Sequence, residues 1–266
     1  MSRRWNFTDL EFVVLCTRYR GGELPNPFTF TSRIEYENPF EAEVGRIMRA
    51  FGSRFDPDLE DLADTISKPD VMVVLQAWDD RDFENPKERS RVLGIRRRAR
   101  GFLITQRPGE TLYHSDGFDV EECSPHALAD AVVAHMAVLE AGREPPVPLP
   151  ATAPPDTGDD DLFGSMVSDN EDPDLSDAFR AAAFFGTEAS RSGLLQVLQG
   201  RSKFGPRGRT ESVLLWWDMP ADGRYVMHVS DAPVAVGMGS DALVSWVNEQ
   251  VGDVMERLDR HREDEE

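Results

Sequence analysis

Three residue types of a hydrolytic triad stand side by side in His114-Ser115-Asp116. A working triad needs serine, imidazole and carboxylate to hydrogen-bond in series, and adjacent residues cannot point at one another in that geometry. We therefore expect solvent-facing strand and turn residues here. No GxSxG, Walker A or HExxH pattern occurs, nor a GxGxxG after a predicted strand. Gly237-Met238-Gly239-Ser240 lacks the lysine and the spacing of a phosphate-binding loop, so we interpret it as a strand–helix turn.

Metal and cofactor chemistry is not indicated either. Asp159-Asp160-Asp161 lacks the alternating carboxylates, the glycine and the distal glutamate of an EF-hand. The two cysteines, Cys16 and Cys123, have no CxxC partner and no histidine cluster nearby, so we expect small buried residues in a reducing compartment. We predict no metal, no cofactor and no enzymatic activity.

The charge is strongly acidic, with 29 Lys and Arg against 49 Asp and Glu, a net charge of −20. Such a surface repels nucleic acid and anionic membranes, and it keeps a protein soluble. The dense basic run Arg96-Arg97-Arg98 with Arg100 falls on a predicted strand, where side chains alternate between faces. We expect it to protect a sheet edge or to contact the acidic surface of the protein itself, not nucleic acid.

The sequence predicts a cytoplasmic protein. Ser2-Arg3-Arg4 is followed by polar residues, not by the apolar stretch of an export signal. The longest apolar stretch, residues 127–139, contains Asp130 and His135 and is too short to span a membrane.

The apolar periodicity predicts helices and strands in two successive runs. Thr8 and Glu11 have the spacing of a capping box, and Gly21-Gly22 ends the helix that they begin. Pro220-Ala221-Asp222-Gly223 predicts a hairpin turn, in which Asp-Gly supplies the positive φ. We predict strands over residues 3–7, 71–78, 91–98, 101–106, 111–120, 211–219, 224–230 and 233–236, and helices over 8–19, 38–52, 57–66, 126–140, 175–200 (one or two) and 240–260.

The two runs end alike, with strands followed by a capped helix. A shift of 115 residues pairs Ser115 with Ser230 and Val132 with Val247, which indicates a weak internal repeat. Six prolines between Pro145 and Pro155, followed by acidic residues, are typical of a linker. We therefore predict an α+β fold with two pseudo-symmetric halves, residues 1–141 and 175–266, joined by a linker over 142–174.

The pair Trp216-Trp217 is the clearest candidate for function. Because successive strand residues point to opposite faces, one indole can fill the core. The other lies either under a helix or on an open apolar surface suited to binding a partner. The candidate partner-binding residues are Trp216, Trp217, Met219 and Phe83, the last in the polar loop 79–86.

Four stretches together resemble the EspG family of type VII (ESX) secretion-associated proteins of actinobacteria. They are residues 5–15 (WNFTDLEFVVL), 108–115 (PGETLYHS), 160–164 (DDLFG) and 216–220 (WWDMP), the last followed by Gly223-Arg224-Tyr225. The resemblance runs over nearly the whole chain in matching order.

This resemblance implies a central, mostly antiparallel sheet with helical bundles and two quasi-twofold halves. It also implies a cytosolic chaperone that uses no cofactor and keeps a secreted helical-hairpin protein, PE/PPE-like or WXG100-like, soluble for export. Two other classes stay open: a permanent structural or regulatory subunit of a complex, and an enzyme with an unrecognised site.

Overall fold

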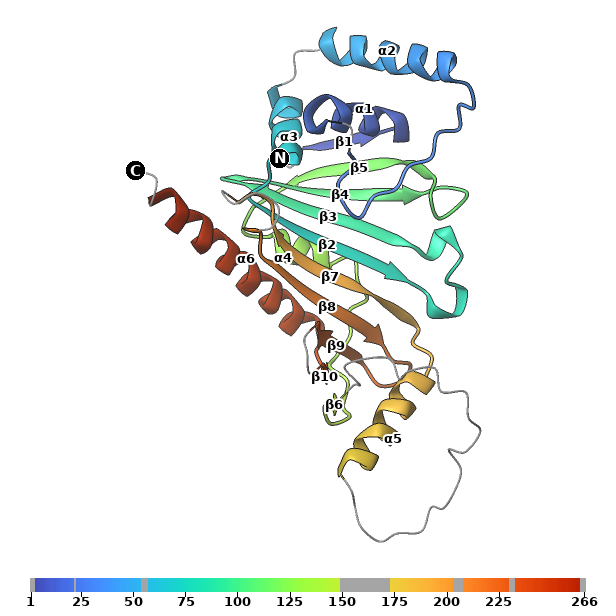
Figure 1. Cartoon of the computed structure of the whole chain (residues 1–266), viewed down its shortest axis with the longest axis vertical. Helices are drawn as coiled ribbons and strands as arrows, with labels where there is room; N and C mark the ends of the chain where they lie inside the picture. The colour runs from blue at the N-terminus through green and yellow to red at the C-terminus, as the bar shows by residue number, and fades with distance from the viewer. Residues whose placement is uncertain are drawn as a thin grey trace.

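The computed structural model describes residues 3–21, 23–53, 57–148, 173–202, 208–229 and 233–263 (Figure 1). The α-helices of this part of the chain are α1 (Asp9–Arg20), α2 (Glu37–Ser53), α3 (Pro57–Ser67), α4 (Leu128–Val133), α5 (Pro173–Gly186) and α6 (Ser240–Glu263), and two short 3-10 helices lie between β2 and β3. Its strands are β1 (Arg4–Phe7), β2 (Val71–Trp78), β3 (Ser90–Arg97), β4 (Arg100–Pro108), β5 (Ser115–Cys123), β6 (Val147–Pro148), β7 (Arg191–Gln199), β8 (Glu211–Asp218), β9 (Arg224–His228) and β10 (Val234–Gly237).

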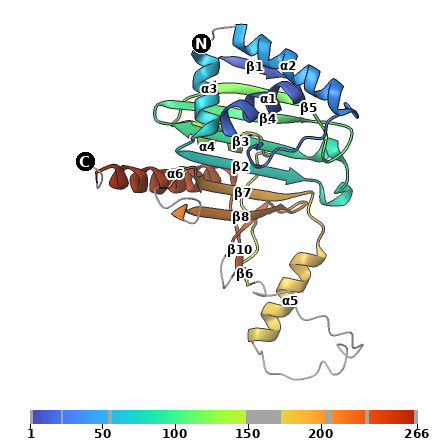
Figure 2. The same cartoon turned by 45° about the horizontal axis from the view of Figure 1, so that its top comes forward.

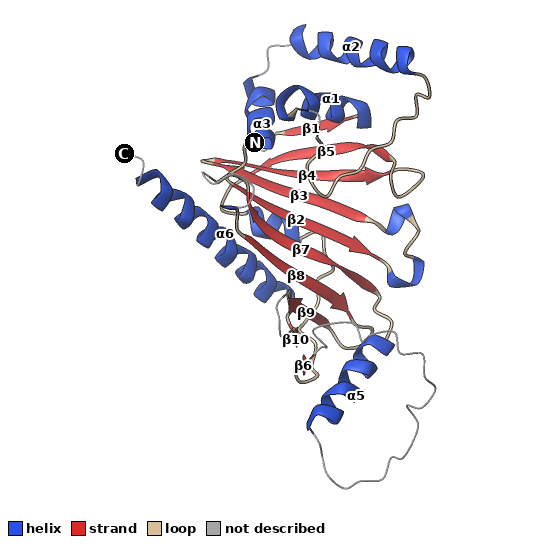
Figure 3. Cartoon of the chain, viewed as in Figure 1, coloured by secondary structure: helices blue, strands red, loops and turns tan. Residues whose placement is uncertain are grey.

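The described strands form one antiparallel sheet of ten strands in the order β1-β5-β4-β3-β2-β7-β8-β9-β10-β6 (Figure 3). At its centre β2 and β7 pair along their length, from Val71 opposite Gln199 to Trp78 opposite Ser192. On either side of this pair three strands follow one another outward and are succeeded by a helix, α4 or α6. This arrangement confirms the predicted α+β fold with a central antiparallel sheet and two similar halves.

One face of the sheet, which we call the α6 face, is covered by α4 and α6. Alternate residues of β2 point into this layer, because the side chains of a strand alternate between faces. The layer contains Val71, Val73 and Leu75 of β2, Leu195 and Val197 of β7, Leu128 and Val132 of α4, and Leu243, Val247, Val251 and Leu258 of α6.

The opposite face, which we call the α1 face, is covered over its N-terminal half by α1 and α3. Phe12 of α1 stacks on Phe118 of β5, with ring centroids 4.2 Å apart, and Leu62 of α3 is buried in the same cluster. Helix α2 forms a further layer on α1, where Ile47 packs against Leu10 and Val14. Figure 2 shows α1, α2 and α3 together at one end of the molecule and α5 at the other.

Local signals set the ends of α1 as predicted. The Thr8 hydroxyl accepts from the Glu11 amide at 3.2 Å, and the Glu11 carboxylate accepts from the Thr8 amide at 2.9 Å, so the capping box is complete. Gly21 ends the helix with a left-handed φ of 75°.

The helix predicted over residues 126–140 is wrong in length, since α4 ends at Val133. The chain that follows runs along β9, where its backbone finds partners outside any helix. The Arg224 amide donates to Glu140 O, the Gly142 amide donates to Arg224 O, and the Ser240 amide donates to Leu139 O. These tertiary hydrogen bonds replace the ones that a longer helix would have made.

The prediction of one or two helices within residues 175–200 is right for the first part and wrong for the second. Helix α5 ends at Gly186, and Leu194, Leu195 and Leu198 lie on β7. A short apolar run suits a buried strand and a buried helix equally, and the pairing with β2 decides between them. In the turn after β8 the positive φ, 62°, falls on Ala221, not on the Asp-Gly pair. Most of the predicted linker 142–174 lies outside the described residues, and the domain boundaries stay a prediction.

A buried ion pair fastens the start of β9. Arg224, which is fully buried, donates to Asp218 from Nε at 2.6 Å and from Nη2 at 3.0 Å. The same Nη2 also donates to Ala137 O at 2.9 Å. The pair therefore joins β8, β9 and the segment after α4.

Among the described helices, none combines the length and apolar character needed to cross a bilayer.

The change Asp218→Ala removes the carboxylate and leaves the Arg224 guanidinium buried without it. We expect the free energy of unfolding to fall by about 3–5 kcal/mol, the usual cost of breaking a buried pair from one side. Urea unfolding followed by circular dichroism measures this. Glu43→Ala, which breaks the exposed Glu43–Arg46 pair of α2, is the matched control and should leave the midpoint unchanged. If the two changes lowered the free energy of unfolding equally, the stabilising role of the Asp218–Arg224 pair would be contradicted.

Candidate partner-binding surface

Beyond the cover of α1 and α3, the α1 face carries a row of side chains that crosses four neighbouring strands. The strand registers place Trp78 opposite Ser192, Ser192 opposite Trp217, and Trp217 opposite Tyr225. All four therefore share one face, and we call them the aromatic row. A parallel row two residues along each strand contains Gln76, Leu194, Leu215 and Met227, all half-buried.

At the β2 end of the aromatic row, the loop between β2 and β3 packs on Trp78. Phe83 is 51% exposed and makes an edge contact with Trp78, with ring centroids 5.9 Å apart. The Arg89 guanidinium lies 3.9 Å from the centroid of Phe83 and 5.2 Å from that of Trp78, so it holds both rings by cation–π attraction. An apolar ring is thus presented on an ordered loop.

The acidic residues of this loop hold its shape and its position. Asp79 accepts from the backbone and the guanidinium of Arg81, and these hydrogen bonds lower the pKa of Asp79 to about 2. The Ser192 hydroxyl donates to the Asp80 carboxylate, which places the loop beside the centre of the aromatic row. Arg191 Nη2 donates to Glu88 O at 3.0 Å and ties the far end of the loop to β7.

At the β9 end, α5 lies over the aromatic row. Phe184 meets Trp217 and Tyr225 edge to face, with centroid distances of 5.6 Å and 5.4 Å. Ala181, one turn earlier, packs with Val147 and Ala235. Trp217 therefore lies under a helix, which was one of the two arrangements left open by the sequence.

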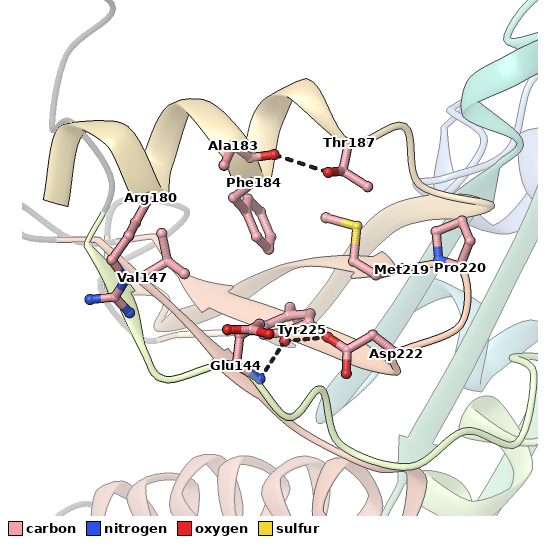
Figure 4. Close-up of a pocket in the computed structure, with 10 residues that line it drawn as sticks. All are labelled: Glu144, Val147, Arg180, Ala183, Phe184, Thr187, Met219, Pro220, Asp222 and Tyr225. Atoms are coloured by element: carbon pink, nitrogen blue, oxygen red, sulfur yellow. Dashed lines mark hydrogen bonds between the residues drawn. The ribbon is translucent and has the colours of Figure 1, made fainter. Parts of the chain in front are cut away.

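Two hollows flank Phe184. One, of about 270 Å³, lies between α5, β6 and the β8–β9 turn, and is lined by Val147, Ala183, Met219 and Tyr225 among others (Figure 4). The other, of about 360 Å³, is lined by Asp80, Trp217 and Met219 together with the end of α5. Apolar side chains dominate the lining of the first hollow, which suits the apolar side chains of another protein, whereas Asp80 and Glu188 make the lining of the second more polar.

Tyr225 forms the polar floor of the first hollow (Figure 4). Its hydroxyl donates to the Asp222 carboxylate at 2.5 Å and accepts from the Glu144 amide at 2.9 Å. Burial raises the pKa of Tyr225 to about 12, so the phenol stays protonated and remains a donor. The hydrogen bond from Tyr225 in turn lowers the pKa of Asp222.

The structure brings together some of the predicted site residues and separates others. Trp217 lies in the aromatic row, Met219 lines both hollows, and Phe83 lies at the other end of the row. Trp216 points to the α6 face, is 1% exposed and packs in the core beneath α6, so we leave it out of the proposed surface.

Trp78, Phe184 and Tyr225 were not among the residues predicted to bind a partner. Trp78 ends a strand whose period of two was visible, so its face could have been deduced from the pattern. The contacts of Phe184 with β8 and β9 depend on a tertiary packing that no local pattern contains.

The residues considered first for chemistry have structural roles. Ser115 is fully buried, contrary to the expectation of a solvent-facing residue, and its hydroxyl donates to Gly117 O at 3.1 Å. His114 Nδ1 contacts the Thr111 hydroxyl at 2.7 Å. Within the described ranges, no group of three or more histidine, cysteine or acidic side chains is placed to hold a metal ion.

The other motifs behave largely as expected. Arg97 pairs with Asp64, and Arg100 lies within 3.3–3.6 Å of Asp58, Asp61 and Glu122, so the basic run contacts the acidic surface of the chain itself. Edge protection is excluded, because β3 and β4 are interior strands. The segment 237–240 is the predicted strand–helix turn between β10 and α6.

Comparison with known proteins gives two findings. The model of the EspG family matches residues 8–249 of the sequence. Among solved structures, the chain is similar to the Mycobacterium tuberculosis type VII secretion system chaperone EspG5, solved in complex with the PE25–PPE41 dimer. That match has a TM-score of 0.56 and 14% sequence identity, and covers 96% of each chain. A search of curated proteins finds no match.

The change Tyr225→Phe removes the hydroxyl that joins Asp222 to the Glu144 amide. We expect a loss of about 1–2 kcal/mol in the free energy of unfolding at neutral pH, because the Glu144 amide and the Asp222 carboxylate each lose a hydrogen bond. The pKa of Asp222 should rise toward its ordinary value, which carboxyl NMR titration measures.

A depressed carboxyl pKa stabilises the fold above the unfolded pKa, and this stabilisation is lost as the pH falls through the folded pKa. The variant should therefore lose less stability than the wild type on acidification through that window. Tyr36→Phe, at a tyrosine 72% exposed, is the control. An unchanged pKa of Asp222 would contradict the proposed link.

Proposed function

This chain belongs to the EspG family, and from that premise we propose that it is a cytosolic chaperone of a type VII secretion system. In this proposal it binds a secreted helical-hairpin protein of the PE/PPE or WXG100 type and keeps it soluble until export. It acts by binding and not by catalysis. The observation that carries the proposal is the family match over residues 8–249, and the fold shared with a chaperone bound to a PE–PPE dimer supports it.

The geometry offers a place for such a partner on the α1 face. The end of a helical hairpin presents apolar side chains that aggregate when they are exposed to water. A surface that can cover them needs apolar and aromatic side chains on a rigid base, and the aromatic row with Phe83 supplies these on a continuous sheet. We place the partner's contacts at Trp217, Met219 and Phe83.

The charge of the protein fits this role. With a net charge of −20, copies of the chain repel one another, so an apolar surface can stay available without self-association. The acidic side chains of the β2–β3 loop, among them Asp80, lie beside the surface and favour a partner whose end is basic.

The direct experiment is a pull-down of the tagged full chain from the cytosol of its own host, with mass spectrometry of the co-purifying proteins. We expect one small helical-hairpin protein or heterodimer. Recovery of no such partner from cells that actively secrete these substrates would count against the chaperone proposal.

Phe83→Ala tests the surface itself. Truncating an exposed aromatic anchor at the centre of an interface costs about 1–3 kcal/mol, so the dissociation constant for the recovered partner should rise roughly 10- to 100-fold. Titration calorimetry measures this. Tyr36→Ala removes a more exposed aromatic ring, directly before α2, a helix that packs on α1, and should leave the affinity unchanged. Equal affinities of the two variants would remove Phe83 from the binding surface.

A further inference from the structure

The described side chains of helix α5 make few apolar contacts with the sheet. Among the described side chains of α5, only Ala181 is buried, and Phe184 is half-buried. By contrast, α6 buries Leu243, Trp246, Val247, Val251, Val254 and Leu258 on the other face. Because apolar stabilisation grows with the buried area, the described side chains of α5 contribute far less to holding their helix than those of α6. Elements with few buried contacts open at a small free-energy cost, without unfolding the rest of the protein.

The packing beneath α5 is also incomplete. The hollows of about 270 Å³ and about 360 Å³ lie on the two sides of Phe184, each large enough for one or more side chains. Polar contacts of Arg180 add to the apolar ones. Arg180 Nη2 donates to Pro145 O at 3.0 Å and to Pro146 O at 2.5 Å. The helix therefore occupies the site without filling it.

The way in which α5 occupies the site shows what fits there. Ala181 and Phe184 are three residues apart and so lie on one face of the helix. The small side chain lets the helix approach β6 and β10, while the aromatic ring enters between Trp217 and Tyr225. Any helix with a small residue followed three positions later by an aromatic residue can make the same contacts, and larger neighbouring side chains would enter the hollows.

We propose that the β9 end of the aromatic row, formed by Trp217 and Tyr225, is the docking site for a partner helix with this small-x-x-aromatic face, and that α5 occupies this site in the free protein. The partner helix displaces α5 when it binds. In the free chain α5 then covers Trp217 and Tyr225 while the Phe83 end of the surface stays exposed, and the partner's affinity is lowered by the free energy of releasing α5. The identification of this partner helix with the secreted substrate rests on the proposed function.

The test uses the α5 sequence itself as the probe. A fluorescein-labelled peptide of residues 173–186 is titrated into the full-length chain and followed by anisotropy. In the wild type the tethered α5 competes at a high effective concentration, so the peptide should bind weakly. In the variant Phe184→Ala the internal competitor loses its anchor, and the peptide should bind at least 10-fold more tightly.

Three controls isolate the contribution of the Phe184 ring. Phe179→Ala makes the same truncation at a residue of α5 that is 58% exposed, and should bind the peptide as the wild type does. A peptide with alanine in place of Phe184 should lose its affinity for the Phe184→Ala chain. Amide hydrogen exchange of that variant should show faster exchange in α5 with unchanged exchange in β7 and β8, which establishes that the sheet is still folded.

The outcomes are distinguishable from those of the proposed function, because the peptide replaces the secreted partner. Equal peptide affinities for Phe184→Ala and Phe179→Ala would overturn the displacement proposal, whatever the pull-down recovers. If a partner is recovered but binds Phe184→Ala more weakly than the wild type, Phe184 is part of the partner's surface and the displacement proposal is likewise wrong. Peptide binding without any recovered hairpin protein would leave the docking site standing and remove the chaperone function.

Discussion

The pairing of β2 with β7 is the constraint on which the rest of the structure depends. These two central strands come from opposite halves of the chain, and their eight residue pairs join the halves into one sheet. A continuous sheet has two faces to cover along its whole width. Helices α4 and α6 cover one face, while α1 and α3 cover only the N-terminal half of the other. The partner surface proposed above is a consequence of this asymmetry.

The same pairing decides what each side chain of β7 and β8 can do. Because successive side chains of a strand point to opposite faces of the sheet, Trp216 lies in the core beneath α6. Trp217 lies on the opposite face, in line with Trp78 and Tyr225. The aromatic row therefore needs four strands in register, drawn from residues 78 to 225. A slip of one residue in any of them would turn its side chain to the other face and break the row. A rigid surface of this kind suits the binding of a partner's apolar end.

Several elements could be predicted from local sequence because their signals are local. The capping box of Thr8 and Glu11, the left-handed Gly21 and the apolar run of β2 act over a few residues. The helix predicted over 126–140 is shorter than predicted, and the second part of the helical region predicted over 175–200 is a strand, because contacts with distant backbone decided both segments. Hydrogen bonds that involve Arg224 and Gly142 keep residues 137–142 from forming a helix. Pairing with β2 places Leu194 and Leu195 in a strand. The residues of the proposed surface divide in the same way, since Phe83 and Trp217 were visible as aromatic residues of a predicted loop and strand, whereas the cover of Trp217 by Phe184 depends on tertiary packing.

The sequence by itself determined the family, the α+β class, the acidic surface and the alternation that sends Trp216 and Trp217 to opposite faces. These follow from composition, short-range spacing and the period of a strand, none of which needs knowledge of distant contacts. Only the tertiary structure decided which of the two indoles lies in the core, and that α5 covers the other. That choice depends on which helices pack against each face of the sheet, and such packing is set by contacts between residues far apart in the chain.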